Sequence, residues 1–195
     1  MGVLLALAAA ASVAPPAFAH TGLDIGGGLA AGFAHPFFGA DHLLAMLTVG
    51  ALAASAAGRA RRALWALPLS FMAIMAVGGA LGVTGLALPA VEQGIALSLV
   101  VFGTLLATRV GLPVPAAMAV VGLFALFHGH AHGAELPEFA SPASYVAGFV
   151  AATGLLHLGG ILAGLGLARI GTPRISALRL AGGAVAASGV ALLIP

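Results

Sequence analysis

The sequence contains no cysteine, no lysine and very few charged residues. Its 195 residues include seven basic and five acidic side chains, and charged residues make up 6% of the chain. The absence of cysteine excludes disulfides, thiolate metal sites and thiol catalysis. The absence of lysine excludes a Walker A loop, which needs its lysine on the phosphates. A soluble domain carries about 25% charged residues, so this composition excludes an ordinary soluble protein.

Apolar residues fill most of the chain. They account for 62% of it, and the mean hydropathy is +1.17. At about 20 residues per transmembrane helix, we predict an all-α membrane protein: a bundle of about six transmembrane helices after a cleaved signal peptide. Residues 20–195 would form a single transmembrane domain. The expected spans are about 26–57, 63–84, 89–108, 113–131, 143–168 and 175–194, with the first helix broken at Pro36 and Gly39.

The N-terminal segment has the pattern of a secretory signal peptide. Residues 2–14 are apolar, two prolines follow, and Ala17-Phe18-Ala19 has the small-residue pattern of a cleavage site. Cleavage there would make 1–19 the signal peptide and His20 the first residue of the mature chain. The alternative is an uncleaved first helix, because no positive charge precedes the apolar core.

The arginines predict the orientation in the membrane. All seven lie in, or just inside, the loops between spans one and two, three and four, and five and six. They share one side of the membrane, and the positive-inside rule makes that side cytoplasmic. We therefore expect a multi-pass protein of the bacterial inner membrane with a periplasmic mature N-terminus and C-terminus. The acidic residues and most histidines fall on the periplasmic side.

The segment from His35 to His42, HPFFGADH, is the strongest functional signal. It places two imidazoles and a carboxylate where a charged group costs roughly 2.5–3.5 kcal/mol. Pro36 and Gly39 favour a break in the helix, and irregular backbone at membrane depth is tolerated where it lines a cavity. Imidazole and carboxylate are ligands of divalent transition metals. We predict a central metal site at Asp41 and His42 with His35 as a partner. The alternative is a structural role, in which hydrogen bonds from these polar residues hold helices together.

A second group of histidines follows the apolar part of span four. His128, His130 and His132 alternate with small residues, and such tracts often bind metals. We expect His128 to be a deep ligand, and His130 and His132 to be solvent-facing capture ligands at the mouth. The alternative is a wet loop with incidental histidines.

Three further residues complete the candidate set. Glu92 begins span three, His157 lies near the middle of span five, and His20 could chelate a metal through its ring and the new α-amine. Glu92 has a simpler interpretation, because an acid favours a helix N-terminus. His157 has one too, because a lone histidine in a membrane helix can hydrogen-bond a neighbour. The candidate metal ligands are therefore His35, Asp41, His42, Glu92, His128, His20, His130, His132 and His157.

These motifs resemble those of the HupE/UreJ family of nickel permeases. The resemblance rests on HPFFGADHLLAM (35–46) and is extended by EQGI (92–95), FHGHAHGAE (127–135) and TGLLH (153–157). It implies a secondary transporter, and not an enzyme, that carries Ni²⁺ or Co²⁺ from periplasm to cytoplasm for hydrogenase or urease maturation. It implies no permanent cofactor. The expected partners are the transported divalent transition-metal ion and membrane lipid, with a second copy of the chain as a further candidate and no nucleic acid.

The residues themselves leave a different class open. Nitrogen and oxygen ligands without cysteine fit Ni²⁺, Co²⁺ or Zn²⁺ better than Cu⁺. An intramembrane zinc-dependent hydrolase would place His35, His42 and His128 on the metal and use Asp41 as its base. The few polar residues in the inner halves of the spans favour that alternative. A third, a periplasmic metal sensor or storage protein, is disfavoured because no cytoplasmic output domain is present.

Overall fold

The described part of the chain is entirely helical. The structure, a computed structural model, describes residues 28–136, 141–169 and 174–194, and it contains no strand in these ranges. The predicted all-helical fold class is confirmed. The expected signal peptide and His20 lie outside the described residues. The elements are α2 (Gly28–Ala34), the 3-10 turn η1 (His35–Phe37), α3 (Ala40–Ala57), α4 (Ala63–Val83), α5 (Val91–Thr108), α6 (Val114–Ala134), α7 (Pro142–Arg169) and α8 (Arg174–Leu193).

Five of these helices are long and apolar enough to cross a membrane. They are α3 to α7, with mean hydropathies between 1.4 and 1.9 over their apolar windows. The sixth, α8, carries a shorter apolar stretch, Ala177–Leu193. Large apolar side chains such as Trp65, Leu123 and Leu162 are exposed on the outside of the bundle. This is the surface that a lipid environment requires, and the chain is a multi-pass membrane protein.

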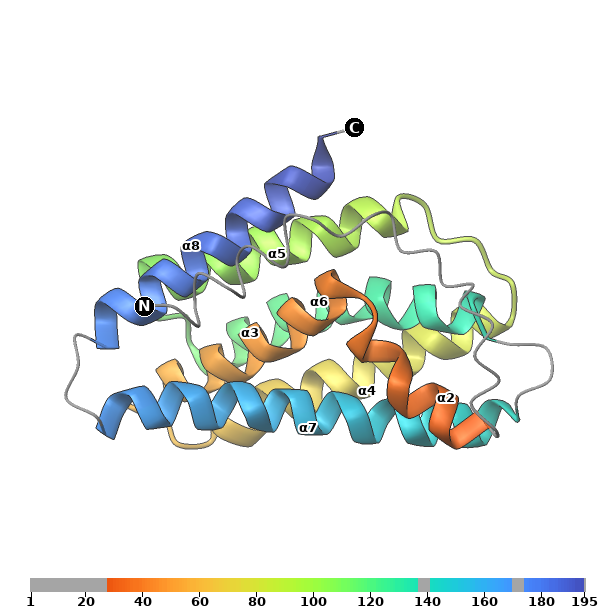
Figure 1. Ribbon diagram of the computed structural model, residues 1–195, viewed down its shortest axis with the longest axis horizontal. Helices are drawn as coiled ribbons and strands as arrows, with labels where there is room; N and C mark the ends of the chain where they lie inside the picture. The colour runs from red at the N-terminus through yellow and green to blue at the C-terminus, as the bar shows by residue number, and fades with distance from the viewer. Residues whose placement is uncertain (1–27, 137–140, 170–173, 195) are drawn as a thin grey trace.

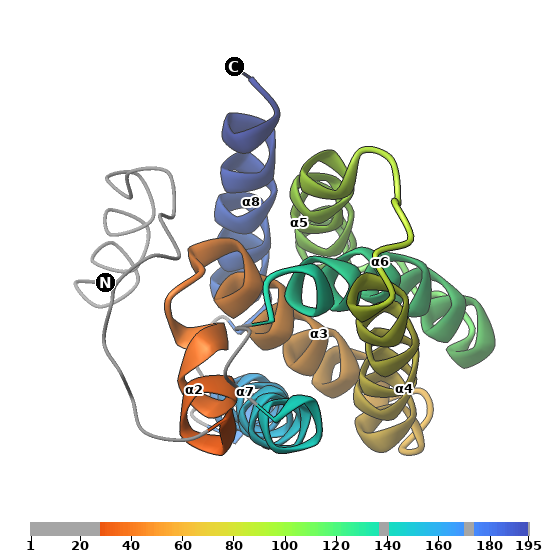
Figure 2. The same ribbon diagram turned by 90° about the vertical axis from the view of Figure 1, so that its right-hand side faces the viewer.

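Helices α3 to α8 run in alternating directions along the bundle (Figure 1). The loops that join them therefore gather at two ends, and these ends differ in chemistry. One end, which we call the arginine end, carries the described arginine side chains Arg59, Arg61, Arg62, Arg109 and Arg179. The opposite end, the histidine end, carries the segments 35–42 and 128–132 and faces the viewer in Figure 2. The separation of charge expected from the sequence is therefore a property of the fold.

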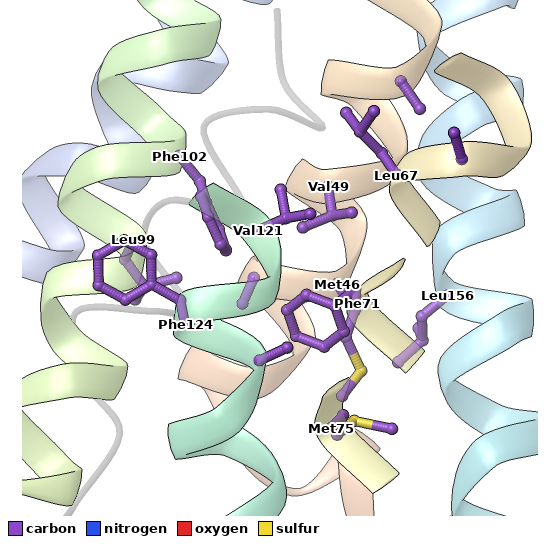
Figure 3. Packing of buried hydrophobic residues seen from close by; sticks show 14 of the residues in the cluster. Met46, Val49, Leu67, Phe71, Met75, Leu99, Phe102, Val121, Phe124 and Leu156 are labelled. Atoms are coloured by element: carbon purple, nitrogen blue, oxygen red, sulfur yellow. The ribbon is translucent and has the colours of Figure 1, made fainter. Parts of the chain in front are cut away.

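The helices pack in pairs around α3. Helix α4 lies on α6, α5 on α8, and α3 on α7, while the short α2 lies along α7 at the histidine end (Figure 2). Helix α3 also contacts α4 and α5, so its buried face points toward the middle of the bundle. Apolar side chains from α3, α4, α5 and α6, among them Met46, Phe71, Phe102 and Phe124, fill this space (Figure 3).

Glycines allow two of these pairs to touch backbone to backbone. A Cβ atom on Gly129 of α6 would overlap the carbonyl oxygen of Met75 in α4. A Cβ atom on Gly50 of α3 would overlap the carbonyl oxygen of His157 in α7. Close approach through small residues is a usual basis of helix association in membranes. These contacts fix how deep the side chains next to each glycine lie.

We expect Gly129→Ala to lower the free energy of unfolding by about 1–3 kcal/mol, because the added methyl group forces two helix backbones apart. The matched control is Gly166→Ala in α7, where nothing lies within 4 Å of the added Cβ. Thermal stability in detergent measures both changes. Equal melting temperatures for the two variants would contradict the close contact between α4 and α6.

Candidate metal centre

The first helix is broken where the sequence predicts a break. Helix α2 ends at Ala34, the 3-10 turn carries the buried Pro36, and Gly39 is extended with φ −94° and ψ 110° before α3 begins. Proline lacks the N–H that a continuing helix would need. The break offsets α2 from α3 (Figure 2) and leaves His35 and His42 on separate elements at the histidine end.

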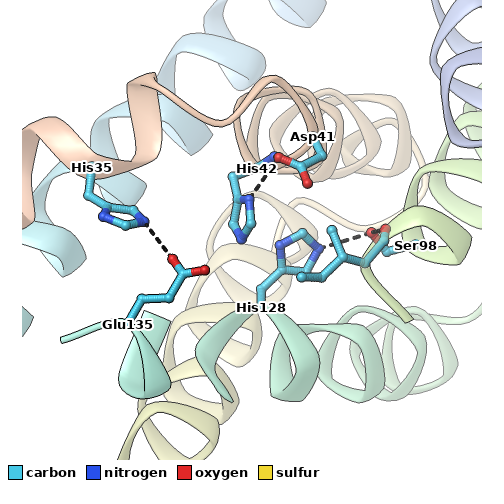
Figure 4. Close-up of polar contacts among 7 residues, drawn as sticks. His35, Asp41, His42, Ser98, His128 and Glu135 are labelled. Carbon is cyan, nitrogen blue, oxygen red and sulfur yellow. Dashed lines mark hydrogen bonds and ion pairs between the residues drawn. The ribbon is translucent and has the colours of Figure 1, made fainter. Parts of the chain in front are cut away.

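His35 connects the break to two other helices. Its Nδ1 lies 2.8 Å from the hydroxyl of Tyr145 in α7. Its Nε2 lies 3.6 Å from Oε2 of Glu135, directly after α6 (Figure 4). The neutral imidazole is the form of His35 that would bind a metal.

Asp41 and His42 form a carboxylate–imidazole pair. Oδ1 of Asp41 accepts hydrogen bonds from the backbone N–H of His42 and from its Nδ1, both at 2.8 Å. Since a carboxylate only accepts, the proton of the neutral ring is on Nδ1 and Nε2 carries the lone pair. Nε2 is buried and has no hydrogen-bond partner among the described residues. A carboxylate that orients a histidine in this way makes it a better metal ligand.

His128 is held in a single tautomer from α5. The hydroxyl of Ser98 donates its hydrogen to the carbonyl oxygen of Ile95 at 2.6 Å. It can therefore only accept from Nε2 of His128, which lies 2.9 Å away (Figure 4). Nδ1 of His128 then carries a lone pair, and it is buried without a partner in the described part of the chain. Thus His42 and His128 each have one buried ring nitrogen whose lone pair has no hydrogen-bond partner among the described residues.

His132 lies at the centre of the group, which corrects its expected place at a solvent-facing mouth. Its ring centroid is 4.6 Å from that of His35 and 4.3 Å from that of His42. Only 4% of the residue is exposed, and neither ring nitrogen has a hydrogen-bond partner within the described ranges. The physical reason is that α6 continues to Ala134, so His128 and His132, four residues apart, share one face.

His130 is also buried and does not face solvent, which corrects the second half of that expectation. It projects from α6 in a different direction, and its Nε2 donates to the carbonyl oxygen of Leu86 at 2.7 Å. Only 8% of it is exposed. His130 ties the end of α6 to the connection between α4 and α5.

The structure thus brings four histidines together in what we call the histidine cluster: His35, His42, His128 and His132. The His42 and His128 rings are 4.8 Å apart. Ligand atoms of His35, His132 and Glu135 lie within 4.8 Å of one another. An unsatisfied buried polar atom costs about 1–3 kcal/mol, so the several bare nitrogens here favour a ligand that accepts their lone pairs. A divalent transition-metal ion is such a ligand.

Two other predicted ligands lie away from this cluster. Glu92 is exposed in the first turn of α5, and no hydrogen bond or ion pair within the described ranges joins it to the histidines. His157 is buried in α7 and contacts Phe71.

Three residues of the site were not among the predicted ligands. Glu135 follows the histidine tract directly, and this proximity was the available signal. Tyr145 is the only tyrosine of the chain, and a single phenol in so apolar a sequence is a signal of its own. No local signal in the sequence identifies Ser98, because its hydrogen-bond partner is 30 residues away.

The fold and the site together define a multi-pass membrane protein with a cluster of buried histidines at one end. The family model described as "HupE / UreJ protein" matches residues 7–192. The chain is 50% identical over 178 residues to "Protein HupE" of Rhizobium leguminosarum bv. viciae, which covers 91% of this chain and 90% of that protein. The chain belongs to the HupE / UreJ family, a family of membrane permeases. No solved structure matches it significantly.

Proposed function

We propose that this protein is a secondary transporter that takes up Ni²⁺, with Co²⁺ as a second substrate, and supplies it for hydrogenase or urease maturation. The observation that carries the proposal is the set of buried, unpartnered imidazole nitrogens on His42, His128 and His132 in a chain of a permease family. Neutral imidazoles with carboxylates nearby suit these two ions. The maturation role comes from the family resemblance.

The ion enters at the histidine end and moves inward along the cluster. Glu135, whose side chain is 49% exposed, and His35 receive it at the surface. His132 lies next, then His42, and the fully buried His128 is the deepest member. Each step exchanges one imidazole for a neighbouring one. The half-buried carboxylate of Asp41 offsets part of the charge of the ion throughout.

The membrane potential supplies a driving force for this direction of transport. Moving one charge is worth about 2.3 kcal/mol per 100 mV, hence about 4.6 kcal/mol for a divalent ion. The arginine end would then face the cytoplasm, as the positive-inside rule requires. No nucleotide is needed.

Asp41 favours transport over hydrolysis. A zinc-dependent hydrolase needs a carboxylate base that can reach the metal-bound water. Here Oδ1 of Asp41 accepts two hydrogen bonds from His42. That arrangement suits an orienting residue better than a proton acceptor.

Uptake of radioactive nickel tests the function, in cells depleted of other nickel importers and with Co²⁺ and Zn²⁺ as competitors. We expect saturable uptake that depends on this protein and is competed by Co²⁺. Uptake no greater than in cells without the protein would contradict the proposal.

The orientation makes a separate prediction. A reporter enzyme that is active only in the periplasm should be active when it is fused after α8, because α8 ends at the histidine end. A reporter that is active only in the cytoplasm should be inactive at the same position. A fusion within the connection between α3 and α4, which contains Arg59, serves as the cytoplasmic control. A cytoplasmic C-terminus would overturn the proposed orientation.

A further inference from the structure

Two polar side chains of α7 are buried outside the histidine cluster without a partner. His157 is 1% exposed and Thr153 is 0% exposed. Both ring nitrogens of His157 and Oγ1 of Thr153 lack a hydrogen-bond partner among the residues described. Residues four apart lie on one helix face. An unsatisfied buried polar atom destabilises a fold, so three such atoms on one helix face are unfavourable as packing and point to a ligand.

The pair lies deeper in the bundle than the histidine cluster. Helix α7 touches α3 here, because a Cβ on Gly50 would overlap the carbonyl oxygen of His157. Gly50 follows His42 by eight residues in α3, which is about 12 Å along the helix axis at 1.5 Å per residue. The backbone of His157 is therefore displaced from that of His42 toward the arginine end, and Thr153, four residues earlier in α7, is displaced by about half as much.

One aromatic ring connects the cluster to this pair. The ring centroid of Phe71 in α4 is 5.6 Å from that of His128, the deepest member of the cluster, and 5.2 Å from that of His157. Phe71 is fully buried in the apolar core, in the same cluster as Met46 (Figure 3). Phe71 therefore packs against both the deepest member of the cluster and His157 of the inner pair.

We propose that His157 and Thr153 form an inner station for the transported divalent cation, next to Phe71, which also contacts His128 of the histidine cluster. This inference rests on the proposed transport function and adds a second site to it. An imidazole nitrogen and a hydroxyl oxygen accept the same class of ion as the cluster. The station has no carboxylate, so it binds more weakly than the cluster around Asp41. Weak binding at an inner site suits transport, because an ion must also be able to leave.

The test uses His157→Leu and Thr153→Val in the full-length protein. Both replacements fill similar volume and remove the ligand atoms. We expect radioactive nickel uptake to fall about tenfold, while the purified protein keeps its affinity for the first equivalent of Co²⁺, measured by absorption titration. Thr153→Ser should restore most of the uptake that Thr153→Val loses. The matched control is Leu155→Val on the exposed face of the same helix, which should transport normally.

Each outcome decides the inference. Normal uptake by His157→Leu and Thr153→Val overturns it. So does an equal loss of first-equivalent Co²⁺ affinity, because His157 would then belong to the cluster. If His157→Leu fails to fold, Thr153→Val decides alone. If the wild-type protein binds Co²⁺ without transporting nickel, the proposed function fails, and the station is judged by whether His157→Leu reduces the number of Co²⁺ ions bound.

Discussion

Replacement of Asp41 by Asn is expected to lower nickel uptake about 10–100-fold while the protein stays folded in the membrane. Asp41 accepts two hydrogen bonds from His42 at 2.8 Å each and so leaves Nε2 of His42 as the ligand nitrogen. An amide oxygen can still accept these bonds. It no longer carries the negative charge that makes His42 more basic and offsets the charge of a divalent ion. Uptake per folded molecule, with the folded amount taken from size-exclusion chromatography, measures the effect.

A charge-conserving variant separates this role from a structural one. Asp41→Glu keeps the carboxylate on a longer side chain and should retain more uptake than Asp41→Asn. If Asp41 only holds helices together, thermal stability falls first and the remaining folded protein transports normally. Near-normal uptake by a well-expressed Asp41→Asn variant would remove Asp41 from the mechanism.

The fold class could be predicted because its determinants are local. A membrane helix reveals itself by about 20 apolar residues in a row, and Pro36 with Gly39 marks a break wherever they occur in such a run. The importance of Asp41 and His42 is local too, because they are neighbours in the sequence, although they were predicted as two metal ligands and not as the hydrogen-bonded pair that the structure shows. These features need no knowledge of how the helices pack.

The contacts that complete the site could not be predicted, because they join distant segments. The Ser98–His128 hydrogen bond spans 30 residues and the His35–Tyr145 hydrogen bond spans 110. Which helix faces meet depends on the order in which the helices pack. Nothing in the sequence near His128 identifies α5 as its neighbour.

The histidine tract shows how a local pattern can mislead. The alternation of histidines with small residues suggested solvent-facing capture ligands at the mouth, and α6 in fact continues through this tract to Ala134. Gly129 and Gly133 are where α6 touches α4, because a Cβ on either would overlap the carbonyl oxygens of Met75 and Gly79, respectively. Here glycine provides close packing, which is its common use between membrane helices. The helical conformation in turn sends alternate histidines to different sides.

That geometry predicts different outcomes for two identical substitutions in the same tract. His132→Gln removes a ring that lies between His35 and His42 in the cluster, at 4.6 and 4.3 Å between centroids. We expect it to lower nickel uptake by about tenfold or more. His130→Gln should retain most uptake, because a glutamine amide can still donate to the carbonyl oxygen that His130 contacts at 2.7 Å, that of Leu86.

The comparison uses uptake at limiting and at saturating nickel, with thermal stability as the measure of folding. Loss of His132 should reduce the rate at both concentrations, because its ring lies close to both His35 and His42 on the proposed path. A tract that merely concentrates nickel at the surface would behave differently. Both variants would then lose uptake equally, and only at limiting nickel. That result would mean that His132 acts as a capture ligand at the surface, and it would contradict the proposed path of the ion through the histidine cluster.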